Sequence, residues 1–180
     1  MDTTAQTKHD LAEAFWRLNA QKDIERISVR ELTELAGYNR GTFYLHFDNI
    51  YDLRRAAEDK LLASVADCAQ YCRANMGKVE LMALMGRFLN LYRKNCTQLV
   101  VLLGPHGDAR FTTELKRLMK DMPLWRVSDP ALQIPAGERE LLLEQTVAGV
   151  LFLITEWLED PHGVSATRLL HLIYDSAIKR

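Results

Sequence analysis

Residues 28–47 decide the fold of this chain, and they read SVRELTELAGYNRGTFYLHF. Ser28 and Glu31 have the spacing of a capping box, in which side chains satisfy the first backbone N–H groups of a helix. Gly37 stands where a helix ends in a left-handed residue, and Asn39 can cap the helix that follows. Apolar residues recur about one turn apart on both sides of Gly37. The stretch therefore predicts two short helices joined by a glycine-bearing turn, which is a helix-turn-helix.

The flanking sequence predicts further helices. Upstream, a stripe of helical period indicates a first helix over about residues 9–21, with Leu11, Ala14, Phe15 and Leu18 on its apolar face. Downstream, Asn49 can cap a long helix that runs towards Asn75. Helical patterns also cover four later segments, residues 79–95, 111–122, 137–159 and 165–179. We therefore expect an all-α chain, with a three-helix domain over residues 1–50 and a larger helical domain over residues 51–180.

The helix-turn-helix resembles the DNA-binding signature of TetR-type transcriptional regulators. The resemblance rests on the pattern Gly37-x-x-x-Gly41-Thr42-Phe43-Tyr44-x-His46-Phe47, followed by Asp52-Leu53, and it covers about residues 8–60. It implies a homodimer that binds a palindromic operator in double-stranded DNA, represses transcription and is released by a small-molecule effector. The chain departs from the family pattern at Ile50, because family members usually carry there, just before the fourth helix, a lysine that can contact a phosphate.

The charge of the chain does not by itself favour nucleic-acid binding. The net charge is −1, and the first fifty residues hold six Lys/Arg against eight Asp/Glu. The local distribution is more favourable, because Arg26, Arg30 and Arg40 surround the two helix N-termini of the motif, which themselves attract phosphate. We therefore expect few ionic contacts with DNA and a modest salt dependence of binding.

The residues predicted to contact DNA lie in and around the second helix of the motif; they are Ser28, Arg30, Asn39, Arg40, Gly41, Thr42, Tyr44, Leu45 and His46. Recognition helices meet base edges with their N-terminal residues, which here are Asn39 to Thr42. Arg40 is the preferred base reader, because a guanidinium can pair with O6 and N7 of guanine through two hydrogen bonds. Gly41 lets the backbone approach the DNA closely.

The family resemblance assigns the other predicted contacts. It implies that Arg30 and Leu45 also touch bases, and that Ser28, Tyr44 and His46 contact phosphates. The alternative is that such polar side chains are ordinary solvated residues on the outer face of an amphipathic helix. The phenylalanines of the motif, by contrast, have the spacing of core residues.

The middle of the chain is rich in methionine and aromatic residues at helical spacing. The set consists of Met82, Met85, Phe88, Tyr92, Phe111, Met119, Met122 and Trp125. Such soft, aromatic side chains suit an apolar effector pocket, although the same pattern also fits a plain hydrophobic core. By resemblance to TetR-type repressors, an effector bound there tilts the connecting helices and separates the paired recognition helices.

The last two predicted helices carry wide apolar stripes that could form a dimer interface. The residues are Val147, Val150, Leu151, Ile154, Trp157 and Leu158 on one helix, and Leu169, Leu172 and Ile173 on the other. Two copies of this helix pair could pack as a four-helix bundle, as in TetR-type dimers. The alternative is that these helices close the protomer's own core.

Other functional classes find little support in the sequence. The three cysteines form no CxxC pair, and we expect no metal, no cofactor and no enzyme activity, since nucleophile-elbow, P-loop and HExxH motifs are missing. The N-terminus lacks the pattern of a signal peptide, and the most apolar run, residues 147–154, is too short to cross a bilayer, so we expect a cytoplasmic protein without a membrane partner. The competing hypothesis is a ligand- or protein-binding module, coactivator-like, on the same fold.

Overall fold

The computed structural model describes residues 3–75, 81–105, 107–128 and 130–179. Within these ranges the chain is helical without strands, which confirms the all-α prediction. Short 3₁₀ turns lie at Ile24–Arg26, Arg126–Ser128 and Pro130–Leu132, and a π-helical turn lies at Tyr174–Ile178. The main helices are α1 (Thr3–Asn19), α2 (Val29–Ala36), α3 (Arg40–Tyr44), α4 (Ile50–Ala74), α5 (Leu81–Leu103), α6 (Ala109–Lys120), α7 (Ala136–Glu159) and α8 (Ala166–Ile173).

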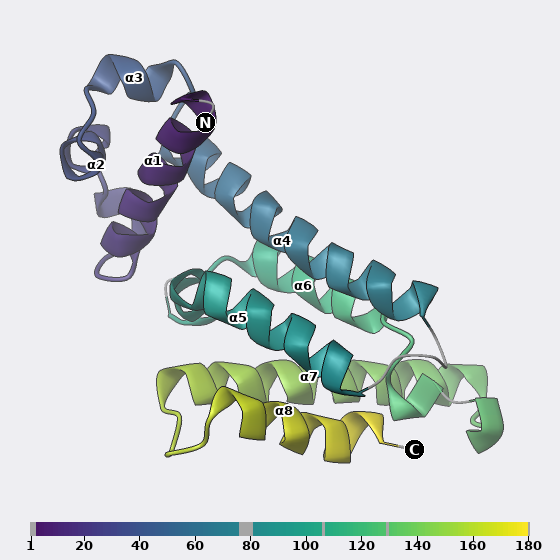
Figure 1. The fold of residues 1–180 in the computed structure, drawn as a ribbon. Coiled ribbons are helices and arrows are strands. Elements are labelled where there is room, and N and C mark those ends of the chain that lie inside the picture. Colours follow the sequence, from purple (N-terminus) through teal and green to yellow (C-terminus); the bar gives the residue numbers. More distant parts are fainter. Residues whose placement is uncertain (1–2, 76–80, 106, 129, 180) are drawn as a thin grey trace.

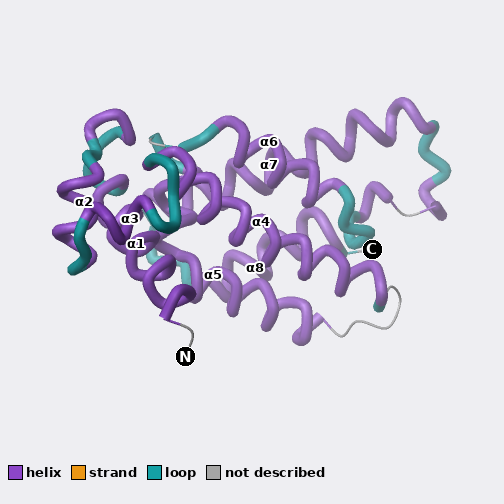
Figure 2. Tube along the Cα trace, turned by 90° about the horizontal axis from the view of Figure 1, so that it is seen from above, coloured by secondary structure: helices purple, strands orange, loops and turns teal. Residues whose placement is uncertain are grey.

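The helices are arranged as a small N-terminal group and a layered C-terminal group (Figure 1). Helices α1 to α3 lie together at one end, and α4 runs from them along the rest of the molecule. Helices α5 and α6 lie between α4 and the pair α7 and α8, and contacts of α4 with both α5 and α6 and of α7 with both agree with this order. Figure 2, seen from above, shows the same separation of α1 to α3 from the later helices.

Local capping fixes the ends of the motif helices as predicted. Ser28 Oγ accepts a hydrogen bond from the backbone N–H of Glu31 at 3.2 Å, and Asn39 Oδ1 accepts one from Thr42 at 2.8 Å. Gly37 ends α2 in the left-handed region, with φ at 79°. The Glu31 carboxylate accepts hydrogen bonds from Lys22 Nζ at 2.7 Å. The capping box is therefore only half formed, and its glutamate ties α2 to the loop after α1.

Two helix predictions differ from the structure. Helix α1 begins at Thr3, earlier than the apolar stripe indicated, and α5 continues to Leu103 beyond the predicted end near residue 95. Residues 79–80 of the predicted segment lie outside the described part. Asn95 itself is non-helical, with φ −131° and ψ 19°, and its Nδ2 donates to the backbone oxygen of Leu91 at 2.8 Å. A side-chain amide that occupies a backbone carbonyl in this way competes with the helix, which explains the break.

A continuous hydrophobic core joins the two groups of helices. In the N-terminal group Leu11, Phe15, Leu32 and Phe43 are fully buried. Burial of each such side chain stabilises the fold by roughly 1.5–3 kcal/mol. Leu53 of α4 is also fully buried, and α1 contacts α4. Helices α1 to α3 are therefore held together by a packed core that includes the start of α4.

Candidate DNA-contacting surface and internal cavity

Helix α3 buries one face and exposes the other. Phe43 is fully buried and packs against Phe47, with ring centroids 5.8 Å apart. On the exposed side, Arg40 reaches solvent, and the side chains of Tyr44 and Leu45 are 58% and 81% exposed. The methyl groups of the exposed Leu45 can contact a thymine methyl in a major groove.

The start of α3 is a rigid, closely packed turn. Asn39 Oδ1 accepts from both the backbone N–H and the hydroxyl of Thr42, at 2.8 and 3.2 Å. A Cβ added at Gly41 would lie 3.1 Å from the same Asn39 oxygen, so any larger residue there would press on the cap. The cap thus uses the Asn39 side-chain oxygen and leaves the Asn39 NH₂ group for other partners. Gly41 has no side chain that would cover the backbone at the start of α3.

The two predicted base-reading arginines have different surroundings. Arg30 Nε is paired with Glu34 Oε1 at 2.7 Å, one turn along α2, and both side chains are exposed. Arg40 is also exposed, and no carboxylate pairs with it among the described residues. The Arg40 guanidinium is therefore free to bind another group, whereas the Arg30 guanidinium is occupied by Glu34.

The predicted phosphate contacts lie at the border of this surface. Ser28 is exposed, and its hydroxyl, which accepts the α2 cap, retains a proton to donate. His46 is half-buried beside Phe47. Ile50 is buried at the start of α4, so the position that carries lysine in the family pattern packs into the core here. Tyr51, next to it in the first turn of the capped helix α4, is exposed.

Two side-chain bonds fix the motif to α1 and the following loop. Tyr38, in the turn between α2 and α3, donates its hydroxyl proton to Asp10 Oδ2 at 2.8 Å. Lys22 and Glu31 form the second link described above. The exposed face of α3 is thus presented by a scaffold held on both sides of the turn.

A buried ion pair lies on α4 between the N-terminal helices and the C-terminal layers. Arg54 Nε donates to Glu58 Oε1 at 2.7 Å, and the two side chains are only 10% and 2% exposed. Arg54 Nη2 also lies 3.8 Å from Asp108 Oδ2, at the N-cap of α6. Burial raises the pKa of Glu58, although the hydrogen bond and charge of Arg54 act in the opposite direction. The pair joins α4 to the start of α6.

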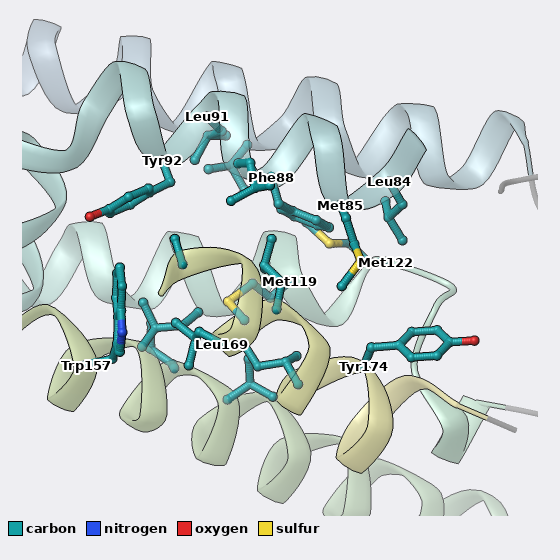
Figure 3. A pocket seen from close by; sticks show the side chains of 18 of the residues that line it. Leu84, Met85, Phe88, Leu91, Tyr92, Met119, Met122, Trp157, Leu169 and Tyr174 are labelled. Atoms are coloured by element: carbon teal, nitrogen blue, oxygen red, sulfur yellow. The ribbon is translucent and has the colours of Figure 1, made fainter. Parts of the chain in front are cut away.

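An internal cavity of about 170 Å³ lies among α4, α5, α6, α7 and α8. Figure 3 shows side chains from these helices converging on it. Six of the predicted pocket residues line the cavity: Met85, Phe88, Tyr92, Met119, Met122 and Trp125. Phe111 does not; it is fully buried in the core near the start of α6. The side chain of Met82 lies outside the described residues. Leu115 and Leu84 were not predicted but also line the cavity.

The residues predicted to form a dimer interface lie mostly inside the protomer. Seven of its residues line the cavity from α7 and α8: Val150, Leu151, Ile154, Trp157, Leu158, Leu169 and Ile173. Val147 is buried in the core at 1% exposure. Side chains that face the interior of their own protomer present little or no surface to a second copy. Of the predicted set, only Leu172 is exposed.

The outward face of α7 is nevertheless apolar. Leu141, Leu142, Phe152 and Leu153 are all exposed, and a Cβ added at Gly149 between them would meet nothing within 4 Å. With apolar residues on both faces, α7 is long and apolar enough to cross a membrane by length and composition, whereas the run 147–154 alone is too short. The apolar residues on the inward face of α7 line the cavity.

The described residues contain no group of three or more His, Cys, Asp and Glu placed to hold a metal. Cys68 and Cys72 are buried on α4, and burial raises the pKa of both thiols. A raised pKa disfavours the thiolate that binds metals, so these cysteines behave as apolar side chains.

Comparison with known proteins identifies the N-terminal helices. The sequence model of the family described as bacterial regulatory proteins, tetR family, matches residues 11–57. These residues include α2, α3 and their caps. Residues 11–57 therefore match the TetR family at the level of sequence. The predicted DNA-binding helix-turn-helix is thereby confirmed. No curated protein sequence matches the chain.

Solved structures resemble the chain over nearly its whole length. A TetR transcriptional regulator from Streptococcus agalactiae 2603V is 18% identical, with a TM-score of 0.64, and the match covers 98% of this chain and 96% of that chain. NalD, the secondary repressor of the MexAB-OprM multidrug efflux pump in Pseudomonas aeruginosa, is 17% identical, with a TM-score of 0.62 and 99% coverage of both chains. The fatty acid degradation regulator FadR from Bacillus halodurans is 13% identical, with a TM-score of 0.64 over 94% and 93% of the chains. The fold of TetR regulators thus extends over the helices that follow residue 57, beyond the residues that the family's sequence model matches.

Proposed function

We propose that this TetR-type chain is a cytoplasmic transcriptional repressor that binds a palindromic operator as a homodimer and releases it when a small-molecule effector binds. The observation that carries the proposal is the exposed face of α3, where the unpaired Arg40 and the exposed Leu45 stand on a helix-turn-helix of the TetR family. The internal cavity supplies the candidate effector site.

DNA recognition is assigned to α3 and the residues around it. Arg40 reads a guanine in the major groove, and Leu45 contacts a thymine methyl. Ser28, Tyr44 and His46 hold phosphates, which positions the helix without reading sequence. Arg30 contacts DNA only after its ion pair with Glu34 breaks. Part of the free energy gained from that DNA contact therefore offsets the loss of the surface pair.

Dimerisation is assigned to the outward face of α7, with Leu172 of α8 beside it. Two recognition helices must be presented together to read a palindrome. The exposed Leu141, Phe152 and Leu153 form an apolar stripe on α7, and Gly149 in the middle allows a second helix to approach closely. This surface replaces the one assigned from the sequence, whose residues face the cavity.

Two of the helices that line the cavity also contact the elements nearest the DNA. On α5, Phe88 and Tyr92 line the cavity, whereas Gln98 donates to Glu13 of α1 at 3.1 Å, with the helix break at Asn95 between them. On α6, Met119 lines the cavity, and the N-terminal Asp108 lies beside Arg54 of α4. Occupancy of the cavity can therefore shift α1 and α4, which gives effector binding a physical route to the recognition helices.

The test is selection of bound duplexes from a random pool by the purified chain at low salt. The proposal predicts enrichment of a palindrome with half-sites about one helical turn or more apart. Arg40→Ala should lose the preference at one base pair in each half-site, by about 1–3 kcal/mol per contact. Arg93→Ala, which removes an exposed arginine on the distant α5, is the matched control and should select the same palindrome.

A second function, a binding module that does not recognise DNA, is favoured by two observations. Glu34 holds Arg30 on the predicted DNA face, and Ile50 is buried where the family pattern has lysine. If the folded, dimeric chain recovers no motif even at low salt, this module becomes the better account and DNA binding is refuted.

A further inference from the structure

We propose that the internal cavity binds one uncharged, hydrocarbon-like ring of about the size of a substituted benzene. The inference rests on the proposed function only in taking this cavity as the effector site.

The cavity wall has almost no polar atoms. None of the described residues that line it is charged, and none carries an amide or an aliphatic hydroxyl. Its side-chain polar groups are the hydroxyls of Tyr92 and Tyr174 and the indole N–H groups of Trp125 and Trp157. A ligand inside the cavity therefore has at most four side-chain groups with which it can exchange hydrogen bonds.

All four groups are already engaged or turned away. Trp125 Nε1 donates to the backbone oxygen of Met119 at 2.7 Å, and Trp157 Nε1 donates to that of Val164 at 2.7 Å. Tyr92 packs its ring against Trp157, with centroids 5.3 Å apart. In Figure 3 the hydroxyls of Tyr92 and Tyr174 point away from the centre of the cavity, at its two opposite ends. A polar or ionised ligand would lose its hydration without gaining a partner, which excludes it.

The volume sets the size of the ligand. Protein interiors are close-packed, with few voids larger than a water molecule, so a cavity of about 170 Å³ is unusual for a plain core. An apolar cavity of about 150 Å³ in another protein stays dry and binds benzene. The cavity here therefore has room for a single ring with a small substituent.

The wall also favours an aromatic ring over a saturated one. Met85, Met119 and Met122 bring three thioether groups to the cavity, and Figure 3 shows the sulfur-bearing side chains of Met85 and Met119 beside the ring of Phe88 and the side chain of Leu169. Thioether sulfur contacts aromatic rings favourably at about 5 Å, mostly at the ring edge. These methionines are flexible enough to adjust to the position of a small ring.

The test compares toluene with benzoate at pH 7.5, which have the same ring and differ in charge. Binding is measured by saturation-transfer NMR on the ligand and by the fluorescence of the tryptophans. We expect saturable binding of toluene to one site and binding of benzoate at least a hundredfold weaker, because its carboxylate cannot be solvated inside. Equal binding of benzoate, or no binding of toluene up to its solubility, would overturn the inference.

Two substitutions and a control locate the site. Leu169→Phe reduces the cavity and should weaken toluene binding at least tenfold, whereas Leu169→Ala enlarges it and should strengthen the binding of naphthalene relative to the unsubstituted chain. Leu141→Ala, on the outward face of α7, should leave toluene binding unchanged. Toluene binding that Leu169→Phe leaves intact in a folded variant would place the ligand elsewhere and contradict the inference. If that variant does not fold, the comparison of toluene with benzoate on the unsubstituted chain still decides the ligand class.

The ligand inference and the proposed function can fail separately. Toluene that binds in the cavity without changing operator affinity would support the inference and refute effector release. A charged or larger compound that binds in the cavity and releases DNA would support effector release and refute the ligand inference.

Discussion

Replacing Arg54 by methionine is expected to destabilise the fold strongly, and most strongly at neutral pH. The substitution keeps a long apolar side chain but leaves the Glu58 carboxylate, which is 2% exposed and 2.7 Å from Arg54 Nε, without its cation. Removing one partner of a buried ion pair costs about 3–5 kcal/mol, because the remaining charge stays desolvated. We therefore expect the free energy of unfolding at pH 7 to fall by that amount.

The pH dependence of Arg54→Met has a defined sign. Burial already raises the pKa of Glu58 above its value in the unfolded chain, and loss of the Arg54 hydrogen bond and charge raises it further. When the pKa of an acid is raised by folding, the folded state binds the proton more tightly than the unfolded state does. The variant should therefore regain stability as the pH is lowered from 7 to 5, more steeply than the unsubstituted chain.

Urea unfolding followed by circular dichroism at pH 5, 6 and 7 measures both effects. The matched control is the double variant Arg54→Met with Glu58→Leu, which replaces both charges by apolar side chains. Such replacements are often neutral or stabilising by about 1–4 kcal/mol, so the double variant should recover most of the lost stability and its pH dependence should flatten. A loss below about 1 kcal/mol for the single variant, independent of pH, would refute the burial argument.

Three further perturbations test other parts of the structure. Phe43→Ala should destabilise the N-terminal helices by about 3–5 kcal/mol in urea unfolding, because the ring is fully buried, and a loss under 1 kcal/mol would show that α3 is not anchored by it. Glu34→Gln frees Arg30 for a phosphate and should steepen the slope of log affinity against log salt by roughly one for each half-site; an unchanged slope would mean that Arg30 stays off the DNA. Phe152→Glu places a charge in the outward stripe of α7, where the side chain is 65% exposed, and should convert the proposed dimer into a folded monomer in light scattering. A dimer that persists would place the interface elsewhere.

The helix-turn-helix could be predicted from the sequence because its determinants are local. The caps at Ser28 and Asn39 and the left-handed Gly37 depend on neighbouring backbone groups, and each lies where the sequence predicted. The break at Asn95 was missed for the opposite reason. An asparagine is acceptable in a helix, and only its observed bond to the Leu91 carbonyl disrupts the helix.

The two faces of α7 could not be told apart from the sequence. Val150 and Leu151 face the cavity, while Phe152 and Leu153 face solvent, so apolar residues follow one another around the whole helix. A helix that is apolar on every side has no periodicity that marks its inner face. The residues predicted for contact with a second copy therefore lie on the face of α7 that lines the cavity, and the outward face is the one we propose for that contact. Phe111 was misplaced in a similar way, since burial alone does not say whether a side chain borders a void.

The most direct test of the whole account is the affinity of the chain for its selected operator with and without toluene, measured by fluorescence anisotropy of a labelled duplex. If cavity occupancy is coupled to α1 and α4, saturating toluene should raise the dissociation constant of the operator by about 5- to 150-fold, the range of a typical coupling free energy. Leu169→Phe should abolish that change while leaving operator affinity without toluene intact. An operator dissociation constant that stays constant while NMR shows the cavity saturated would contradict the account.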